Sequence, residues 1–353
     1  MLSPHQIERK LELSLRRAGD LYSHALRKNA APGQTKMARS GPVKAGPIAL
    51  APDSNWADAF KTIAHACLHQ VVANEPALLR NDSEAVHQMR VGIRRLRAAI
   101  SLFKDMLAGR QTETVKAELK WLAGELGPAR ELDVFMKRAV RDAESSGGNG
   151  PGLSAVIADF HKRRADAMER AAQAVASARF RRLLLDTAAW IEAGDWNRRS
   201  SAAAERTRRT TPAAAGELRR RRKKIRKQGA RLAALDPAQR HRLRIQAKKL
   251  RYATEFFAGA FPGKKLRRRR ERFVARLKDL QDALGELNDI VVHERLAKQE
   301  IGPPNGGQEH PTRAPKAFAA GRLSGRESAR FAAVMKDAER AYGRFAKAKA
   351  FWK

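Results

Sequence analysis

The chain has little cysteine, few aromatic residues and no long hydrophobic run. Its one cysteine, Cys67, excludes an intrachain disulfide, and this usage fits a reducing compartment. Aromatic residues make up 6% of the chain, and together with the abundant alanine this favours close-packed helices over sheets. No apolar run approaches the roughly 18 residues of a membrane-spanning helix, and the N-terminus lacks the apolar core of a signal peptide. We therefore expect an all-α cytoplasmic protein with no membrane segment.

Acidic residues are also scarce. The chain has 37 Asp and Glu against 72 Lys and Arg, which gives a net charge of +35. The excess is concentrated, because residues 198–276 contain 28 basic and 5 acidic side chains. So large a self-repulsion must be offset by a partner, and polyanions are the obvious candidates.

The sequence offers no convincing metal or catalytic cluster. His65 and His69 stand at the i, i+4 spacing of a metal pair, but no third ligand is evident. An enzyme that hydrolyses or transfers phosphate would need a carboxylate cluster to hold its metal, and none stands out. We predict a protein that is not an enzyme and has no cofactor and no metal.

What the chain does have is a helical stretch at residues 86–103, VHQMRVGIRRLRAAISLF. At about 100° per residue, one His and three Arg fall within an arc of roughly 80°. These residues are His87, Arg90, Arg94 and Arg97. The opposite side is apolar and comprises Met89, Ile93, Leu96, Ile100 and Phe103. On its own this is typical of an amphipathic helix with a solvated basic face.

The chain repeats this stretch at residues 241–257, HRLRIQAKKLRYATEFF, at an offset of 154 residues (241 − 87). The repeat places the following residues on the first four, in the same order: His241, Arg244, Lys248 and Arg251. A second echo matches LGPARELDV at 126–134 to LGELNDIVV at 284–292, at an offset of 158 residues (284 − 126). A solvated face has no reason to keep one His and three cations at the same spacing twice, so the duplicated unit indicates function.

The residue types in these rows suit phosphate. Arginine binds a phosphate as a two-pronged fork, lysine acts as a point charge, and histidine donates one hydrogen bond when neutral. Between phosphates the pKa of a histidine should rise, which would make the affinity pH-dependent. We predict that both rows bind a polyanion.

The basic runs at 219–224 and 267–270 are either surface charge or an extension of the polyanion track. Further candidate ligands lie beside the rows and in the run at 219–224. They are Arg95, Lys249, Arg130, Tyr252, Arg220 and Lys224. For Arg95 and Lys249 the alternatives are the rim of the site or plain solvation, and Tyr252 either packs an Arg or contacts ligand. Five polar residues of the second echoed motif either orient the rows or form helix caps and structural ion pairs. They are Arg130, Glu131, Asp133, Asn288 and Asp289.

Periodicity and turn residues predict helices joined by three loop-like stretches, at 145–152, 197–216 and 302–325. Ser54 and Ser83 are expected to cap the first helices, and Asp236 with Pro237 to open the second motif helix. The expected helices are 56–79, 83–103, 111–126, 129–144, 153–177, 180–193, 217–235, 237–261, 264–284, 286–299 and 327–351.

Taken together, VHQMRVGIRRLR, LGPARELDV, HRLRIQAKKLRYATEFF and LQDALGELND resemble the motifs of the CHAD (conserved histidine α-helical domain) family, in the same order. The resemblance covers about residues 53–292 and the final helix. It implies two pseudo-symmetric helical bundles around a basic channel or cleft, binding of inorganic polyphosphate, and association with polyphosphate granules. We expect residues 53–353 to form this domain, with halves at about 53–150 and 151–353.

Residues 1–52 are expected to be an N-terminal extension and linker. Residues 43–48, VKAGPI, are similar to the linker that joins CHAD domains to a preceding triphosphate tunnel (CYTH) domain. Residues 7–26 resemble a fragment of that domain, whereas residues 6–10 alternatively echo its opening ExExK motif. About 50 residues leave no room for the acidic barrel, which argues against a hydrolase.

Two other functions compete with polyphosphate binding. A nucleic-acid-binding protein is the principal rival, because electrostatics does not distinguish one polyanion from another. The scarcity of aromatics for base stacking and the lack of a recognised nucleic-acid motif make nucleic acid the weaker competitor. An accessory or regulatory subunit of a polyphosphate-metabolising enzyme is the other alternative. The sequence does not indicate an oligomeric state.

Overall fold

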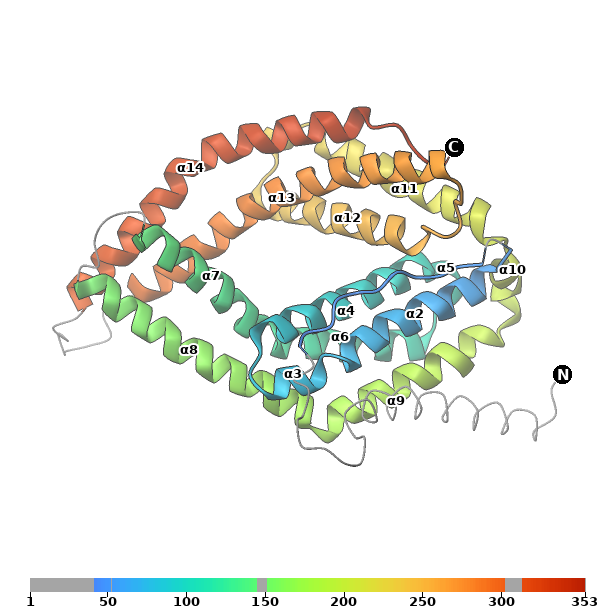
Figure 1. The fold of residues 1–353 in the computed structure, drawn as a ribbon, viewed down its shortest axis with the longest axis horizontal. Helices are drawn as coiled ribbons and strands as arrows, with labels where there is room; N and C mark the ends of the chain where they lie inside the picture. Colours follow the sequence, from blue (N-terminus) through green and yellow to red (C-terminus); the bar gives the residue numbers. More distant parts are fainter. Residues whose placement is uncertain (1–40, 52, 145–150, 302–312, 353) are drawn as a thin grey trace. The chain divides into compact units, whose positions relative to one another are not determined.

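The computed structural model describes residues 41–51, 53–144, 151–301 and 313–352. Helices make up most of this part of the chain (Figure 1). It contains no strand beyond an isolated bridge between Asn55 and Arg209. The all-α prediction is confirmed. None of the described helices combines the length and apolar character needed to span a bilayer.

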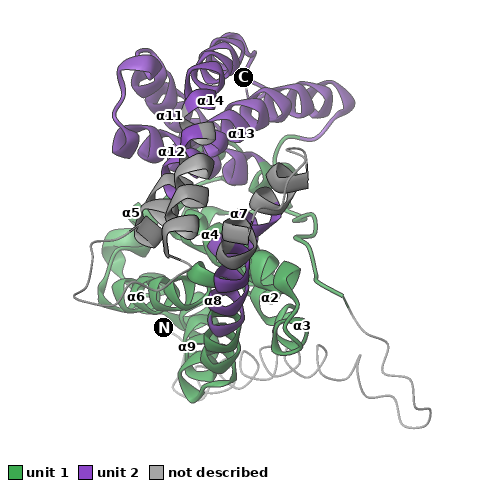
Figure 2. Cartoon of the chain, turned by 90° about the vertical axis from the view of Figure 1, so that its left-hand side faces the viewer, with its two compact units in different colours: residues 1–130, 167–214, 255–261 green, residues 131–166, 215–254, 262–353 purple. Residues whose placement is uncertain are grey.

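The chain divides into two compact units, coloured separately in Figure 2. Unit 1 comprises residues 1–130, 167–214 and 255–261, and unit 2 comprises residues 131–166, 215–254 and 262–353. The predicted division of the domain into halves at about 53–150 and 151–353 stays a prediction. Long helices such as α8 (Pro151–Ala176) contribute residues to both units.

Unit 1 is built around an aromatic core that buries the apolar face of its basic helix. The ring of Phe60 lies 5.3 Å from Phe103, 5.4 Å from Trp190 and 5.3 Å from Trp196, measured between centroids. All apolar positions predicted for the first motif helix are buried, Met89, Ile93, Leu96, Ile100 and Phe103. The helices of this unit are α2 (Trp56–Val72), α3 (Glu75–Leu79), α4 (Ser83–Leu102), α5 (Lys104–Leu107), α6 (Arg110–Glu125), α9 (Ala178–Ala193) and α10 (Ala203–Thr207).

The stretch predicted as one helix at 56–79 forms two helices, because the helical backbone is interrupted at Asn74. The buried Asn74 amide donates to the carbonyl oxygens of Gln70 at 2.7 Å and Val43 at 2.9 Å, and its Oδ1 accepts from the Val43 N–H at 2.9 Å. The stretch predicted as a linker is therefore attached to unit 1 in its described part, where Ile48 and Leu50 are buried.

The predicted cap of the first helix was displaced by one residue. Asn55, not Ser54, is the N-cap of α2, since its side chain accepts from the Asp58 N–H at 2.9 Å. The Ser54 hydroxyl instead lies 3.0 Å from the Thr210 hydroxyl, where α11 (Thr210–Gly229) begins. The stretch predicted as loop-like at 197–216 thus contains 3-10 turns, α10 and the first turns of α11.

Unit 2 contains most of α11, α12 (Pro237–Phe256), α13 (Lys264–Ile301) and α14 (Arg313–Lys347). α13 and α14 run side by side (Figure 1). The helical segments predicted at 264–284 and 286–299 form one helix, α13, which continues through Gly285. A glycine inside a helix costs only about 1 kcal/mol relative to alanine, which tertiary packing readily overrides. α14 also begins before the predicted position, at Arg313 instead of residue 327.

Candidate functional site: two basic rows

The first basic row, here called row 1, comprises His87, Arg90, Arg94 and Arg97 on α4. The helix is started by Asp82, whose Oδ1 accepts from the Glu84 N–H at 2.8 Å and the Ala85 N–H at 3.2 Å. The cap predicted at Ser83 is therefore wrong by one residue. Because the opposite face is buried, the row lies away from the core, with Arg97 exposed and the other three side chains half-buried.

Arg90 is held at the junction of two neighbouring helices. Its Nη1 donates to the Ala123 carbonyl oxygen in the last turn of α6 at 2.8 Å. Gly127, the first residue of α7 (Gly127–Glu144), lies so close that an added Cβ would be 3.3 Å from the same Nη1. The guanidinium therefore has a fixed direction, which lowers the entropy lost when it binds an anion.

Arg94 and Arg97 carry the uncompensated charge of row 1. Among the described residues, neither has an ion-pair partner, and the buried Nε of Arg94 has no hydrogen-bond partner. A buried guanidinium N–H without an acceptor is costly, and an anion beside it would remove that cost.

His87 is uncharged at neutral pH. Burial, and then the nearby Arg130 on α7, lower the pKa of His87 to about 4, with smaller contributions of the same sign from Arg94 and Arg90. Glu84 acts in the opposite sense. In the free protein the imidazole thus lies among cations as a neutral group that donates one hydrogen bond.

The second basic row, row 2, comprises His241, Arg244, Lys248 and Arg251 on α12. Asp236 caps this helix as predicted, since its Oδ1 accepts from the Gln239 N–H at 2.7 Å. His241 is exposed, and its Nδ1 lies 2.6 Å from the Oδ1 of Asn288 on α13. The contact orients the ring through Nδ1 and leaves Nε2 directed elsewhere. Asn288 therefore positions His241, one of the two roles predicted for it.

The remaining members of row 2 are half-buried. Arg244 passes Gly285 of α13, where an added Cβ would lie 3.7 Å from its Nε and Nη2. The Arg251 guanidinium lies 5.2 Å from the centre of the Tyr252 ring, and Tyr252 itself is buried. Tyr252 therefore packs against an arginine, which was one of its two predicted roles.

Two of the further candidates have structural partners. Arg95 was predicted at the rim or in solvent, but it is buried, with Nη1 3.0 Å from Glu255 Oε2 and its guanidinium 5.2 Å from the Phe256 ring. Because Arg95 lies about 80° around the helix from row 1, its side chain points into the core of unit 1. Asp133 is likewise buried, and Lys137 and Arg164 lie 3.1 Å and 3.3 Å from its carboxylate.

The other candidates remain at the surface to different degrees. Arg220 is exposed and pairs with Glu217 at 2.6 Å, whereas Lys224 is exposed without an ion pair among the described residues. Arg130 and Lys249 are half-buried.

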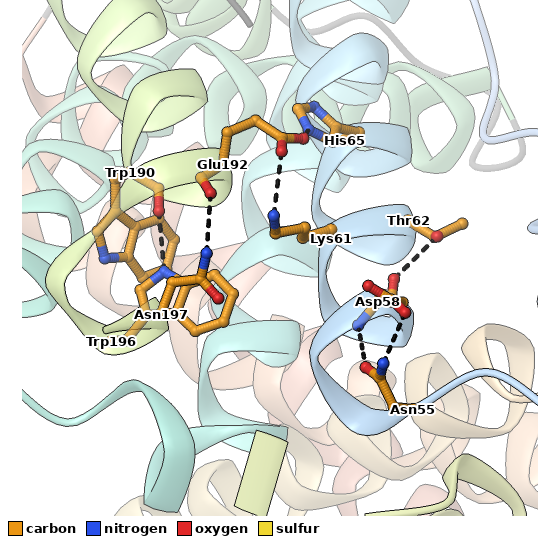
Figure 3. A network of polar contacts seen from close by, with 9 residues as sticks. All are labelled: Asn55, Asp58, Lys61, Thr62, His65, Trp190, Glu192, Trp196 and Asn197. Atoms are coloured by element: carbon orange, nitrogen blue, oxygen red, sulfur yellow. Dashed lines mark hydrogen bonds and ion pairs between the residues drawn. The ribbon is translucent and has the colours of Figure 1, made fainter. Parts of the chain in front are cut away.

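One polar network in unit 1 was not predicted (Figure 3). Glu192 of α9 lies 2.6 Å from Nε2 of His65 and 3.1 Å from Nζ of Lys61, both on α2. The hydrogen bond with His65 is the main reason that the pKa of Glu192 is lowered to about 2. The network joins helices far apart in sequence, which periodicity cannot reveal. The described residues contain no group of three or more His, Cys, Asp or Glu side chains placed to hold a metal ion. The Nε2 of His65 has a carboxylate partner in Glu192.

Comparisons with known proteins agree with this architecture. The model of the CHAD domain family matches residues 62–298, more than half of the chain, and gives no support to a tunnel-domain remnant before residue 53. The predicted remnant falls mostly on residues 1–40, outside the described residues. No curated protein is significantly similar in sequence.

Two solved structures share the fold. The crystal structure of the CHAD domain from the plant Ricinus communis is 29% identical, with a TM-score of 0.72, and the match covers 88% of this chain and 98% of that chain. PptA from Streptomyces chartreusis is 20% identical, with a TM-score of 0.60, and the match covers 82% of this chain and 100% of that one. The extent of the family match, together with the two histidine-containing helices that begin its repeats, shows that the chain belongs to the CHAD domain family.

Proposed function

We propose that the chain binds inorganic polyphosphate through rows 1 and 2 and performs no chemical step on it. The observation that carries the proposal is the duplicated row, in which a histidine and three cations recur at the same helical positions of α4 and α12. In both copies the first arginine of the row lies next to a glycine of a neighbouring helix, Arg90 next to Gly127 and Arg244 next to Gly285.

The side chains around the rows favour a ligand made of phosphate alone. Single-stranded nucleic acids are bound largely by stacking bases on aromatic rings. Among the side chains that the structure describes, the exposed large hydrophobic residues include no aromatic one. Guanidinium forks and a lysine, by contrast, recognise phosphate oxygens without reading a base.

The proposal also covers how a long chain is bound and where the protein acts. A polyphosphate bound by both rows at once would gain affinity through effective concentration, without any new contact. Attachment to polyphosphate granules, as the family resemblance implies, would follow from this binding. A role as accessory subunit of a polyphosphate-metabolising enzyme is compatible with the same rows.

A competition assay tests the specificity. Labelled long-chain polyphosphate is bound to the protein at physiological salt and then displaced with tRNA, duplex DNA or unlabelled polyphosphate. We expect unlabelled polyphosphate to displace the label at far lower phosphate concentration than either nucleic acid. Equal or better displacement by DNA or tRNA would overturn the choice of ligand.

A pair of variants ties the binding to row 1. Arg94→Gln with Arg97→Gln should reduce polyphosphate affinity at least tenfold, because each charge-assisted hydrogen bond contributes roughly 1.5–3 kcal/mol. The matched control, Arg170→Gln with Arg182→Gln, removes the same charge from exposed positions of unit 1 outside the row. Equal losses in both variants would mean that net charge, and not the row, binds the ligand.

A further inference from the structure

The two copies of the motif differ beside their histidines. Alignment of the repeats places Arg130 at the position of Asn288 (288 − 130 = 158). In unit 2, the Oδ1 of Asn288 lies 2.6 Å from the Nδ1 of His241, a neutral partner for an exposed ring. In unit 1, the same position is Arg130, whose positive charge acts on the half-buried ring of His87.

The surroundings of His87 are strongly cationic. Arg90 and Arg94 lie on its own helix α4. Arg130 lies on α7 about one turn after Gly127, the residue next to the Arg90 guanidinium. Among the described residues, Glu84 acts in the opposite sense, and its Oε1 accepts from the Gln88 amide at 2.7 Å. Three guanidinium groups thus oppose a fourth positive charge on the imidazole.

We propose that row 1 is a proton-coupled anion site, in which phosphates bound by Arg90, Arg94 and Arg130 allow His87 to take up a proton. Arg130 becomes a fourth cation of row 1, and Asn288 a residue that positions His241 in row 2. The inference rests on the proposed function, and it adds that pH regulates the affinity of the first copy.

The direction of the effect follows from the charges. Because burial and the cations hold the pKa of His87 at about 4, the free protein carries no proton there above about pH 5. Bound phosphates neutralise the arginines and stabilise the imidazolium, so the complex takes up a proton that the free protein does not. Binding therefore strengthens as the pH falls. If the bound pKa returns to its ordinary value of about 6.5, the gain in affinity between pH 8 and pH 5 is about 30-fold.

The first experiment needs no ligand. The ring signals of His87 are followed by NMR as the pH is lowered, in the wild type and in Arg130→Asn, which installs the residue found in the second copy. We expect His87 to titrate at clearly higher pH in the variant, because one of the opposing cations is gone. Unchanged titration would remove Arg130 from the proposal.

The second experiment measures the coupling itself. Polyphosphate is titrated calorimetrically at pH 6 in buffers of different ionisation enthalpy, which gives the number of protons taken up per bound chain. We expect this number to fall in His87→Asn and to stay at the wild-type value in the control Arg170→Gln. Ionisation of the ligand's own end groups is common to all forms and cancels in the comparison.

Each outcome separates the two claims. If polyphosphate binds but the number of protons taken up is the same in His87→Asn as in the wild type, the proton coupling is overturned and the proposed function stands. No binding by any form would overturn the proposed function and the coupling with it. Circular dichroism of each variant shows whether the helices are intact. Arg130→Asn gives a second measurement of proton uptake, in a variant that retains His87.

Discussion

Arg90 and Arg244 show how one residue of each row is directed by its neighbours. Each passes a glycine on another helix, Gly127 at the start of α7 and Gly285 within α13. The approach is tighter in the first copy, where an added Cβ would lie 3.3 Å from Arg90, than in the second, where it would lie 3.7 Å from Arg244. The two glycines therefore do not tolerate a methyl group equally.

We expect Gly127→Ala to weaken polyphosphate binding several-fold, because the new Cβ displaces the Arg90 guanidinium from the Ala123 carbonyl. Gly285→Ala is the matched substitution in the other copy. It should leave the affinity within about twofold and raise the free energy of unfolding by roughly 0.5–1 kcal/mol, the gain of alanine over glycine in a helix. Titration calorimetry and urea unfolding measure the two effects. A larger affinity loss for Gly285→Ala would contradict this account.

Arg95 lies one position from row 1 and has a different role. It is buried and paired with Glu255, and its partner keeps 31% of its side chain exposed. Glu255→Ala should lower the free energy of unfolding by about 2–3 kcal/mol, since it leaves a buried guanidinium without its carboxylate. Arg97→Ala on the exposed side of the same helix should change stability by less than about 0.5 kcal/mol.

The same pair of variants separates structure from binding. Arg97→Ala should reduce the affinity for polyphosphate, whereas Glu255→Ala, measured below its unfolding transition, should retain it. If Glu255→Ala proves as stable as the wild type, then the ion pair seen between Arg95 and Glu255 contributes nothing to unit 1.

At this scale the sequence predicted the rows, because helical spacing and duplication are both visible in the chain. It did not predict the ion-pair partners of Arg95 and His65, which lie outside the rows. Glu255 lies 160 residues from Arg95, and Glu192 lies 127 residues from His65. Pairs this distant depend on tertiary packing. Asn288 was named as a candidate only because the repeat placed it beside the motif, and its contact with His241 required the structure.

Among the helices, α4 and α12 begin with an acidic N-cap close to the histidine of the row. Asp82 accepts from two N–H groups of α4, and Asp236 from the Gln239 N–H of α12. Each cap satisfies backbone donors that would otherwise lack a partner. The position of each histidine in the first turns of its helix therefore depends on the cap.

Asp82→Ala should lower the free energy of unfolding by about 1 kcal/mol, the usual contribution of an N-cap side chain. Ser83→Ala, one residue further on, should have little effect, because alanine suits a helix interior and the Ser83 side chain does not cap. Thermal unfolding of both variants checks the assignment. A greater loss for Ser83→Ala would restore the cap that the sequence suggested.

The positions of the helices were largely predictable from the sequence, but the breaks and connections between them were not. Residues of strong helical propensity gave α4, α6 and α9 nearly at their observed bounds. The break at Asn74 was missed because it depends on a side chain that binds the distant Val43. The segments predicted at 264–284 and 286–299 form one helix, and its course through Gly285 depends on packing that local propensity does not describe.

For the whole molecule, the net charge of +35 dominates any interaction with a polyanion. We expect the logarithm of the binding constant to fall linearly with the logarithm of the salt concentration, by about 0.7 for each phosphate neutralised if polyphosphate behaves as a single strand. The exposed Arg220 and Lys224 of α11 should contribute to this slope. Arg220→Gln with Lys224→Gln should lower the slope and the association rate more than the affinity at physiological salt.

The central claim is that the two rows bind polyphosphate, and calorimetric titration of row variants tests it most directly. Long-chain polyphosphate is titrated into the wild type, Arg94→Glu with Arg97→Glu, Arg244→Gln with Lys248→Gln, and the combination. Arg90 is left unchanged because it also bonds to α6. Exposed residues of unit 2 outside the row, Lys278→Gln with Lys336→Gln, serve as control.

We predict that each row variant loses at least tenfold in affinity, that the combined variant nearly abolishes binding, and that the control stays close to the wild type. If both rows bind one polyphosphate chain, each row variant lowers the affinity and leaves the stoichiometry unchanged. If the rows bind independently, each row variant halves the stoichiometry and leaves the affinity of the remaining row unchanged. A combined variant that is folded and still binds polyphosphate as the wild type does would contradict the claim that the rows are the binding site.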